Sequence, residues 1–179
     1  MSNSWLLLIY IVPAAPSRKR AAIWRALKQV GAIYLRDGVC ALPQREDTAA
    51  ALRAIAAQIE AFEGQATLVE SAHLAGARAE AIAEQARRER AAEYAELARE
   101  AEGFLEHLRR ETAHRAFTCR ELEELERDLE KLRRWADQIR ARDHFGVAEA
   151  GQVEALLARC DGALGASLEE ASRRDEGRP

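Results

Sequence analysis

The feature that most constrains the fold is an unbroken run of eight apolar residues near the N-terminus, residues 5–12. A helix needs about 20 apolar residues to cross a bilayer, so this run is too short to span a membrane. It has the length of a β-strand that is covered on both faces. Pro13 and Pro16 follow it, and a segment with helical periodicity begins at Ser17. The sequence therefore predicts a sheet against which helices pack.

Predicted strands and helices alternate in the first part of the chain, residues 1–71. A helix over 17–30 is expected to be capped by Ser17 and to end at Gly31, because glycine readily adopts a positive φ. Asp37-Gly38, between two short apolar runs, predicts a type I′ hairpin. The order βαββαβ is that of a ferredoxin-like sandwich, and the fold class is α+β. The expected strands are 5–12, 32–36, 39–42 and 65–70, the second helix covers 47–62 with Gly64 at its end, and the helical core residues are Ile23, Trp24, Leu27, Val30, Leu52, Ile55, Ile59 and Phe62.

The second part, residues 72–174, has no proline and is predicted to form three long helices that pack together. The first is expected over 74–110, and Thr118 to Glu121 form a capping-box pattern that begins the second. The second helix has apolar residues spaced alternately three and four apart, as in a coiled-coil seam. Residues 175–179 are expected to be a disordered tail. The seam residues are Leu122, Leu125, Leu129, Leu132, Ala136 and Ile139, and the apolar residues of the third helix are Val153, Leu156, Leu157, Cys160, Leu164 and Leu168.

Basic residues are concentrated in the first 45 residues. This segment has seven basic residues and one acidic residue, Asp37, a net charge of +6, whereas the whole chain carries −3. Free backbone N–H groups at a helix start also attract negative charge. These features predict contact with DNA phosphates, although a solvated helix face without a binding role would show the same pattern. The candidate DNA-binding residues are Arg18, Lys19, Arg20, Arg25 and Lys28.

The cysteines and histidines are scattered along the chain and show no zinc-site spacing, so no metal or other cofactor is predicted. The three distant cysteines favour a reducing compartment, and the N-terminus lacks the pattern of a signal peptide, so we expect a cytoplasmic protein. Cys40 and Cys160 stand at apolar-pattern positions and are expected in the core. Cys119 lies in the first turn of a predicted helix, where a thiolate is favoured, and is the candidate redox residue.

Several segments of the chain form longer motifs: WLLLIYIVP with SRKRAAIWRALKQVGAIYLRDGVCALP, QATLVES, EQARRERAAEYAEL and FTCRELEELERDLEKLRRWADQIRARDHFG. They resemble the N-terminal region of the ChrB family, whose members regulate chromate resistance and occur beside chromate efflux transporters. The resemblance implies a transcriptional regulator that binds promoter DNA of a chromate-efflux operon, with chromate as a candidate effector. Members commonly carry a second, C-terminal chromate-resistance domain.

The first part also resembles the Cas2-like fold of small CRISPR-associated nucleases and the middle domain of PaaX-type phenylacetate repressors. In those nucleases an aspartate at the end of the first strand binds the metal. The matching position here is Ile11, in Tyr10-Ile11-Val12-Pro13. Magnesium requires oxygen ligands, which isoleucine does not have, so nuclease chemistry by that route is not predicted.

Three functional hypotheses follow from these patterns. The leading one is a DNA-binding regulator that is not an enzyme, since no catalytic motif is present. The others are a relative of the Cas2-like metal-dependent nucleases and a protein-interaction module built on the acidic helical part. We also expect a homodimer and no membrane partner. Cas2-like domains pair through their sheets, palindromic operators suit twofold dimers, and the 122–139 seam could be left partly uncovered by two neighbouring helices.

Overall fold

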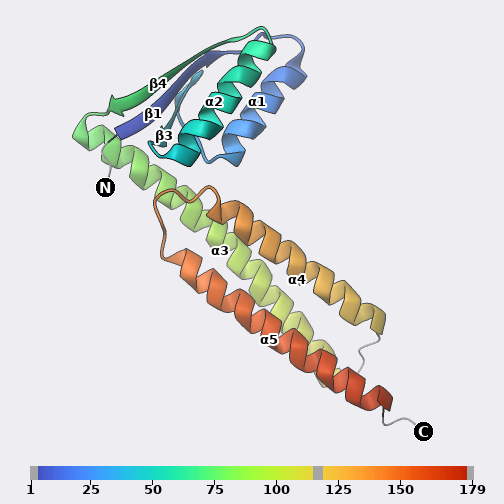
Figure 1. Ribbon diagram of the computed structural model, residues 1–179. Coiled ribbons are helices and arrows are strands. Elements are labelled where there is room, and N and C mark those ends of the chain that lie inside the picture. Colours follow the sequence, from blue (N-terminus) through green and yellow to red (C-terminus); the bar gives the residue numbers. More distant parts are fainter. Residues whose placement is uncertain (1–3, 115–118, 177–179) are drawn as a thin grey trace. The chain divides into compact units, whose positions relative to one another are not determined.

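The computed structural model describes residues 4–114 and 119–176 (Figure 1). Its first part is a four-stranded antiparallel sheet in the order β2-β3-β1-β4, with both helices of this part on one face. This arrangement is the ferredoxin-like sandwich expected from the sequence. The elements are β1 Ser4–Ile11, α1 Ser17–Gln29, β2 Ile33–Arg36, β3 Val39–Pro43, α2 Glu46–Ala61 and β4 Gln65–His73.

The central strand β1 separates two apolar clusters, because successive side chains of a strand point to opposite faces. Leu6 and Leu8 are fully buried on the face that α1 and α2 cover. Trp5 lies on the other face, where it packs with Ile82 from the first turns of the next helix. The apolar run is therefore a strand covered on both faces along its first half. The helical residues that complete the first cluster are Ile23, Leu27, Ala49, Leu52, Ile55 and Ile59.

Two helix ends differ locally from the expectation. Ser17 is the first residue of α1, and Pro16 occupies the N-cap position without a side-chain hydrogen bond. The residue with positive φ after α2 is Glu63, at 64°, rather than Gly64. Gly64 is required for a different reason, since a Cβ there would lie 2.5 Å from the carbonyl oxygen of Ile11.

The β2–β3 hairpin turns at Asp37-Gly38 as expected, but it is not a type I′ turn. That turn needs positive φ at both central residues. Only Gly38 has one, at 69°, and the register shifts between Tyr34 and Arg36. Gly38 also accepts a hydrogen bond at 2.8 Å from the backbone of Tyr10, which joins the turn to β1.

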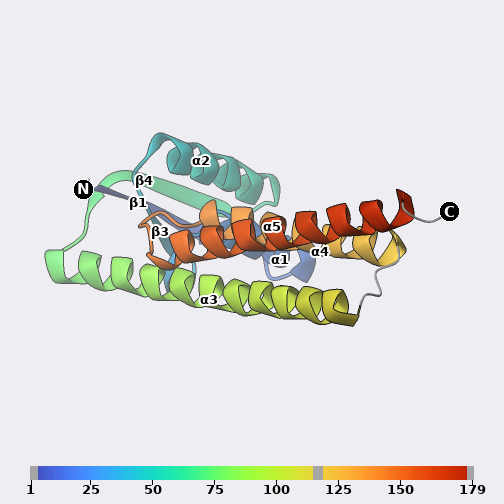
Figure 2. The same ribbon diagram turned by 90° about the horizontal axis from the view of Figure 1, so that it is seen from below.

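Three long helices make up the rest of the described chain, and Figure 2 shows them running side by side. They are α3 Gly76–His114, α4 Cys119–Arg140 and α5 Glu149–Glu176. The predicted seam of α4 is buried against α3 and α5, with Leu129 only 2% exposed and Ile139 fully buried. Every apolar residue predicted for α5 joins the same cluster. The expected capping residue Thr118 lies outside the described residues.

The chain divides into two compact units. The first is Met1–Arg88 with Ala141–Phe145, and the second is Glu89–Arg140 with Gly146–Pro179. The first turns of α3 thus belong with the sheet, beyond residue 71 where we expected the first domain to end. Helix α5 continues to Glu176, two residues into the segment expected to be disordered. Among the described helices, none combines the length and apolar character that a membrane span requires.

Candidate nucleic-acid interface

Helix α1 presents an exposed surface that is entirely basic in its charge. Its 13 residues, SRKRAAIWRALKQ, include no acidic residue. Four of the five candidate DNA-binding residues are exposed, and within the described part of the chain none of the four has a carboxylate partner. Uncompensated charges on one helix attract a polyanion more strongly than paired ones. We call these four residues the basic face: Arg18, Arg20, Arg25 and Lys28.

The fifth candidate, Lys19, is placed differently. Its side chain is only 22% exposed, and its ammonium group donates to the carbonyl oxygen of Phe62 at 3.2 Å and to the carboxylate of Glu63 at 3.1 Å. The ammonium also lies 5.8 Å from the centre of the Phe62 ring. A cation at a helix C-terminus offsets the partial negative charge of the last carbonyl groups. Lys19 therefore joins α1 to the end of α2 and is not part of the basic face.

Trp24 was predicted in the core but is 52% exposed. The buried residues of α1 are Ile23 and Leu27, which lie one helical turn apart. Trp24 shares its row of the helix with Arg20 and Lys28 instead, and the ammonium of Lys28 lies 5.2 Å from its ring centre. The spacing of Trp24 from Arg20 and Lys28, four residues each way, was the sequence signal that could have placed it among the basic residues.

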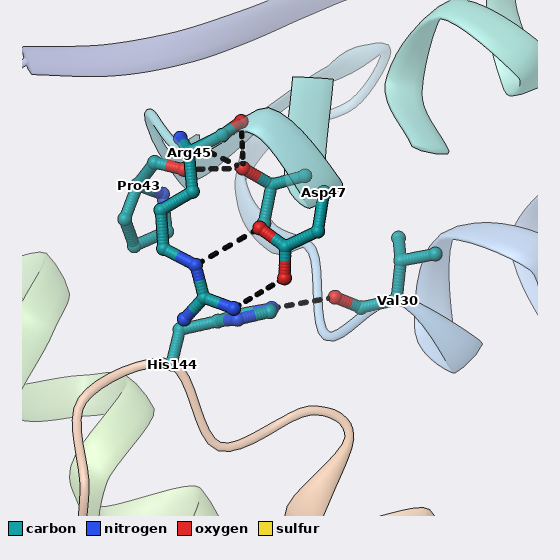
Figure 3. A network of polar contacts seen from close by, with 6 residues as sticks. Val30, Pro43, Arg45, Asp47 and His144 are labelled. Atoms are coloured by element: carbon teal, nitrogen blue, oxygen red, sulfur yellow. Dashed lines mark hydrogen bonds and ion pairs between the residues drawn. The ribbon is translucent and has the colours of Figure 1, made fainter. Parts of the chain in front are cut away.

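The C-terminal end of α1 is held by a segment that is distant in sequence. Gly31 has φ of 72° and ends the helix as expected, and the backbone N–H of Ala32 donates to Leu27 at 3.0 Å. A ring nitrogen of His144 lies 2.8 Å from the carbonyl oxygen of Val30 (Figure 3). The chain at Arg142 passes so close that a Cβ on Gly31 would lie 2.8 Å from its carbonyl oxygen.

A polar network at the start of α2 lies beside the same histidine (Figure 3). Thr48 closes the start of α2, since its hydroxyl donates to Pro43 at 2.7 Å and accepts from the backbone of Arg45 at 3.1 Å. The hydrogen-bonded guanidinium of Arg45 lowers the pKa of Asp47. Burial lowers the pKa of His144, and its hydrogen bond to Val30 opposes this only in part. The lowered pKa thus favours the neutral imidazole of His144, which donates to the end of the basic helix.

Phe145 continues this attachment on the other side of the sheet. Its ring lies 6.0 Å from that of Trp5, and the guanidinium of Arg87 lies 5.8 Å from its centre. From the sequence alone, His144-Phe145-Gly146 is expected only to break the helix that precedes it. The structure instead gives the first two residues specific contacts within the first unit.

The described cysteines are poor redox candidates. Cys40 is fully buried, and burial raises the pKa of its thiol to about 12. Cys160 is buried as well, and its pKa is also raised by burial. Both lie in the core, as predicted. Cys119 begins α4, but its side chain lies outside what the structure describes, so its proposed redox role stays a prediction.

The end of β1 offers no metal ligand where the Cas2-like resemblance would place one. Ile11 occupies the position and is 70% exposed. Over residues 4–114 and 119–176, no group of three or more His, Cys, Asp and Glu side chains is arranged to hold a metal ion.

The order of the elements defines the class of protein to which the chain belongs. It is a ferredoxin-like domain, which carries the basic helix α1, followed by long packed helices. The chain belongs to the family described as Protein ChrB, N-terminal, whose model matches residues 20–174. It is 35% identical over 63 residues to Protein ChrB of Cupriavidus metallidurans. That match covers 35% of this chain and 19% of the relative, so it spans about a fifth of the relative's length. No solved structure matches. The family is the one that the sequence motifs indicated.

Proposed function

We propose that this chain is a cytoplasmic DNA-binding regulator of a chromate-efflux operon, and that α1 is its DNA-contacting element. The observation that carries the proposal is the basic face, four exposed cations that have no acidic partner among the described residues, on a helix that has no acidic residue. Membership of the ChrB family supports the association with chromate resistance.

The rigidity of α1 supports the same role. Its N-terminal turn is joined to α2 by Lys19, and its C-terminal end is held by His144. A helix fixed at both ends holds its backbone in one position, so only the exposed side chains have to lose conformational entropy on binding. The backbone that carries the basic face is therefore already ordered for contact with a polyanion such as DNA.

The proposal is tested by fluorescence anisotropy with the DNA upstream of the protein's own gene and with unrelated DNA of the same length. We expect tighter binding to the upstream fragment, and release of that fragment when chromate is added. Equal weak binding to both fragments would contradict a regulator that selects a site. Selective binding that chromate leaves unchanged would remove chromate as the effector.

The nuclease hypothesis is disfavoured by Ile11, whose side chain offers no oxygen ligand. We propose that the chain binds nucleic acid without cleaving it. The check is incubation of DNA and RNA with Mg²⁺ or Mn²⁺, and cleavage that is lost on chelation would restore the nuclease hypothesis.

A homodimer stays part of the proposal, but the α4 seam no longer supports it, since the seam is buried within one chain. Sedimentation at tens of micromolar protein is the test, and a species of about 20 kDa, the mass of one chain, would count against a dimer.

A further inference from the structure

We propose that Trp24 stacks on an unpaired base of the bound DNA, so that α1 reads a locally opened strand as well as phosphate charge. This inference rests on the proposed DNA-binding function. Trp24 is the one exposed aromatic among the large hydrophobic residues that the structure identifies as exposed within its described part. An aromatic side chain buries roughly 150–250 Å² in total, and about half of Trp24 is still exposed and available to a partner.

The surroundings of the ring identify the partner. The ammonium of Lys28 lies 5.2 Å from its centre, and Arg20 and Arg25 are exposed on the same helix with no acidic partner in the part of the chain that the structure describes. Proteins that bind single strands combine cations, which follow the backbone, with aromatic rings on which bases stack. The faces of bases in a fully paired duplex are covered by their neighbours. The chemistry therefore fits a strand with at least one unstacked base.

A protein partner fits this surface less well. The other exposed large hydrophobic residues, Ile9, Ile11 and Val69, are on β1 and β4. Ile9 and Ile11 alternate with Leu8 and Tyr10, which face α1 and α2, so they point to the opposite face of the sheet. Trp24 is thus a single apolar group among cations and not part of a larger apolar patch. An apolar protein surface covering it would remove those cations from water without pairing them.

The test compares two DNAs with one protein, so that any folding defect affects both measurements equally. One is a fully paired duplex, and the other is the same duplex with a single extra unpaired nucleotide in one strand. We expect the natural chain to bind the second about 10-fold more tightly, as one stacked base allows. Trp24→Leu should bind both DNAs with equal affinity, whereas Trp24→Phe should keep most of the preference. Tryptophan emission should be quenched by the second DNA, and in Trp24→Phe that quenching should be lost.

The outcomes separate the two proposals. Binding to neither DNA overturns the proposed function together with this inference. Equal binding of both DNAs by the natural chain leaves DNA binding standing and overturns base stacking. A preference that persists in Trp24→Leu also overturns it, because the ring would then not be the reader. Another outcome is that the natural chain binds both DNAs with equal affinity and that Trp24→Leu dissociates a dimer. The ring would then be a contact between copies, and base stacking would be excluded.

Discussion

His144 and Val30 lie 114 positions apart in sequence, yet a ring nitrogen of His144 is 2.8 Å from the carbonyl oxygen of Val30. Val30 is the C-cap of α1, so the contact satisfies a carbonyl group that the helix itself leaves free. His144, in the loop after α4, thereby fixes the end of α1, the helix that carries the basic face. The contact gives the loop after α4 a defined role in presenting that face.

This contact predicts a pH dependence of stability. Burial lowers the pKa of His144 in the folded protein, whereas the unfolded chain titrates near the ordinary value of about 6.5. Below that ordinary value the unfolded state binds more protons, so the free energy of unfolding should fall as the pH decreases from about 6.5 through the lowered pKa. Urea unfolding at a series of pH values checks this. His144→Gln is the matched control, since it keeps a donor for Val30 but does not titrate, and an identical pH dependence in both proteins would contradict the prediction.

Gly31→Ala should destabilise the protein more than Gly146→Ala. Both glycines have positive φ, 72° and 67°, so both substitutions carry the backbone strain of about 1 kcal/mol or more. A Cβ on Gly31 would also meet the carbonyl oxygen of Arg142 at 2.8 Å, while a Cβ on Gly146 meets nothing within 4 Å. The measurement is the urea midpoint of each variant. If both variants lost equal stability, the backbone at Arg142 would have to move away from the new Cβ without a loss of free energy, which would contradict the prediction.

Lys19→Ala should lower the free energy of unfolding. It should not weaken DNA binding in the way that loss of a basic-face residue does. Hydrogen bonds to charged groups contribute about 1.5–3 kcal/mol to the free energy of unfolding. Because Lys19 is partly exposed, we expect its contribution at or below the lower end of that range. Arg18→Ala is the control, because its exposed side chain should change the free energy of unfolding by less than about 0.5 kcal/mol. Thermal unfolding and DNA affinity are measured for both. A stable Lys19→Ala variant with strongly reduced affinity would place Lys19 in the interface after all.

Leu129→Lys should unfold the helical unit. Leu129 is 2% exposed in the cluster of α3, α4 and α5, and losing a buried leucine alone costs about 2–5 kcal/mol before the charge is considered. Glu126→Lys, on an exposed position of the same helix, is the control and should remain folded. Circular dichroism and sedimentation distinguish the cases. A folded Leu129→Lys monomer derived from a dimer would show that the seam is an interface.

The sandwich and the helical part that follows it could be predicted because their signals are local. The run around Leu6 and Leu8, glycine at position 31 and the spacing of the seam from Leu122 to Ile139 each depend on nearby residues alone. The order of strands then follows from the order of elements, since few topologies connect βαββαβ with short loops.

The parts that sequence did not predict depend on long-range contacts. Trp24 was assigned to the core because helical spacing puts it on one face with Ile23 and Leu27, whereas it lies at the edge of that face and the sheet covers only the side of Ile23 and Leu27. Lys19 was grouped with Arg18 and Arg20 by adjacency, although its partners Phe62 and Glu63 follow α2. His144 was treated as a helix break because its partner Val30 is remote in sequence.

The most direct test of the central claim is the salt dependence of DNA binding. The logarithm of the affinity is measured against the logarithm of the salt concentration for the natural chain, for Lys19→Gln, and for a variant with all four residues of the basic face changed to Gln. Each phosphate contact contributes about −0.9 to the slope on duplex DNA. We predict that the fourfold variant loses about 0.9 of slope for each contact removed, while Lys19→Gln keeps the natural slope. A folded fourfold variant with unchanged slope and affinity would contradict the assignment of α1 as the DNA-binding element.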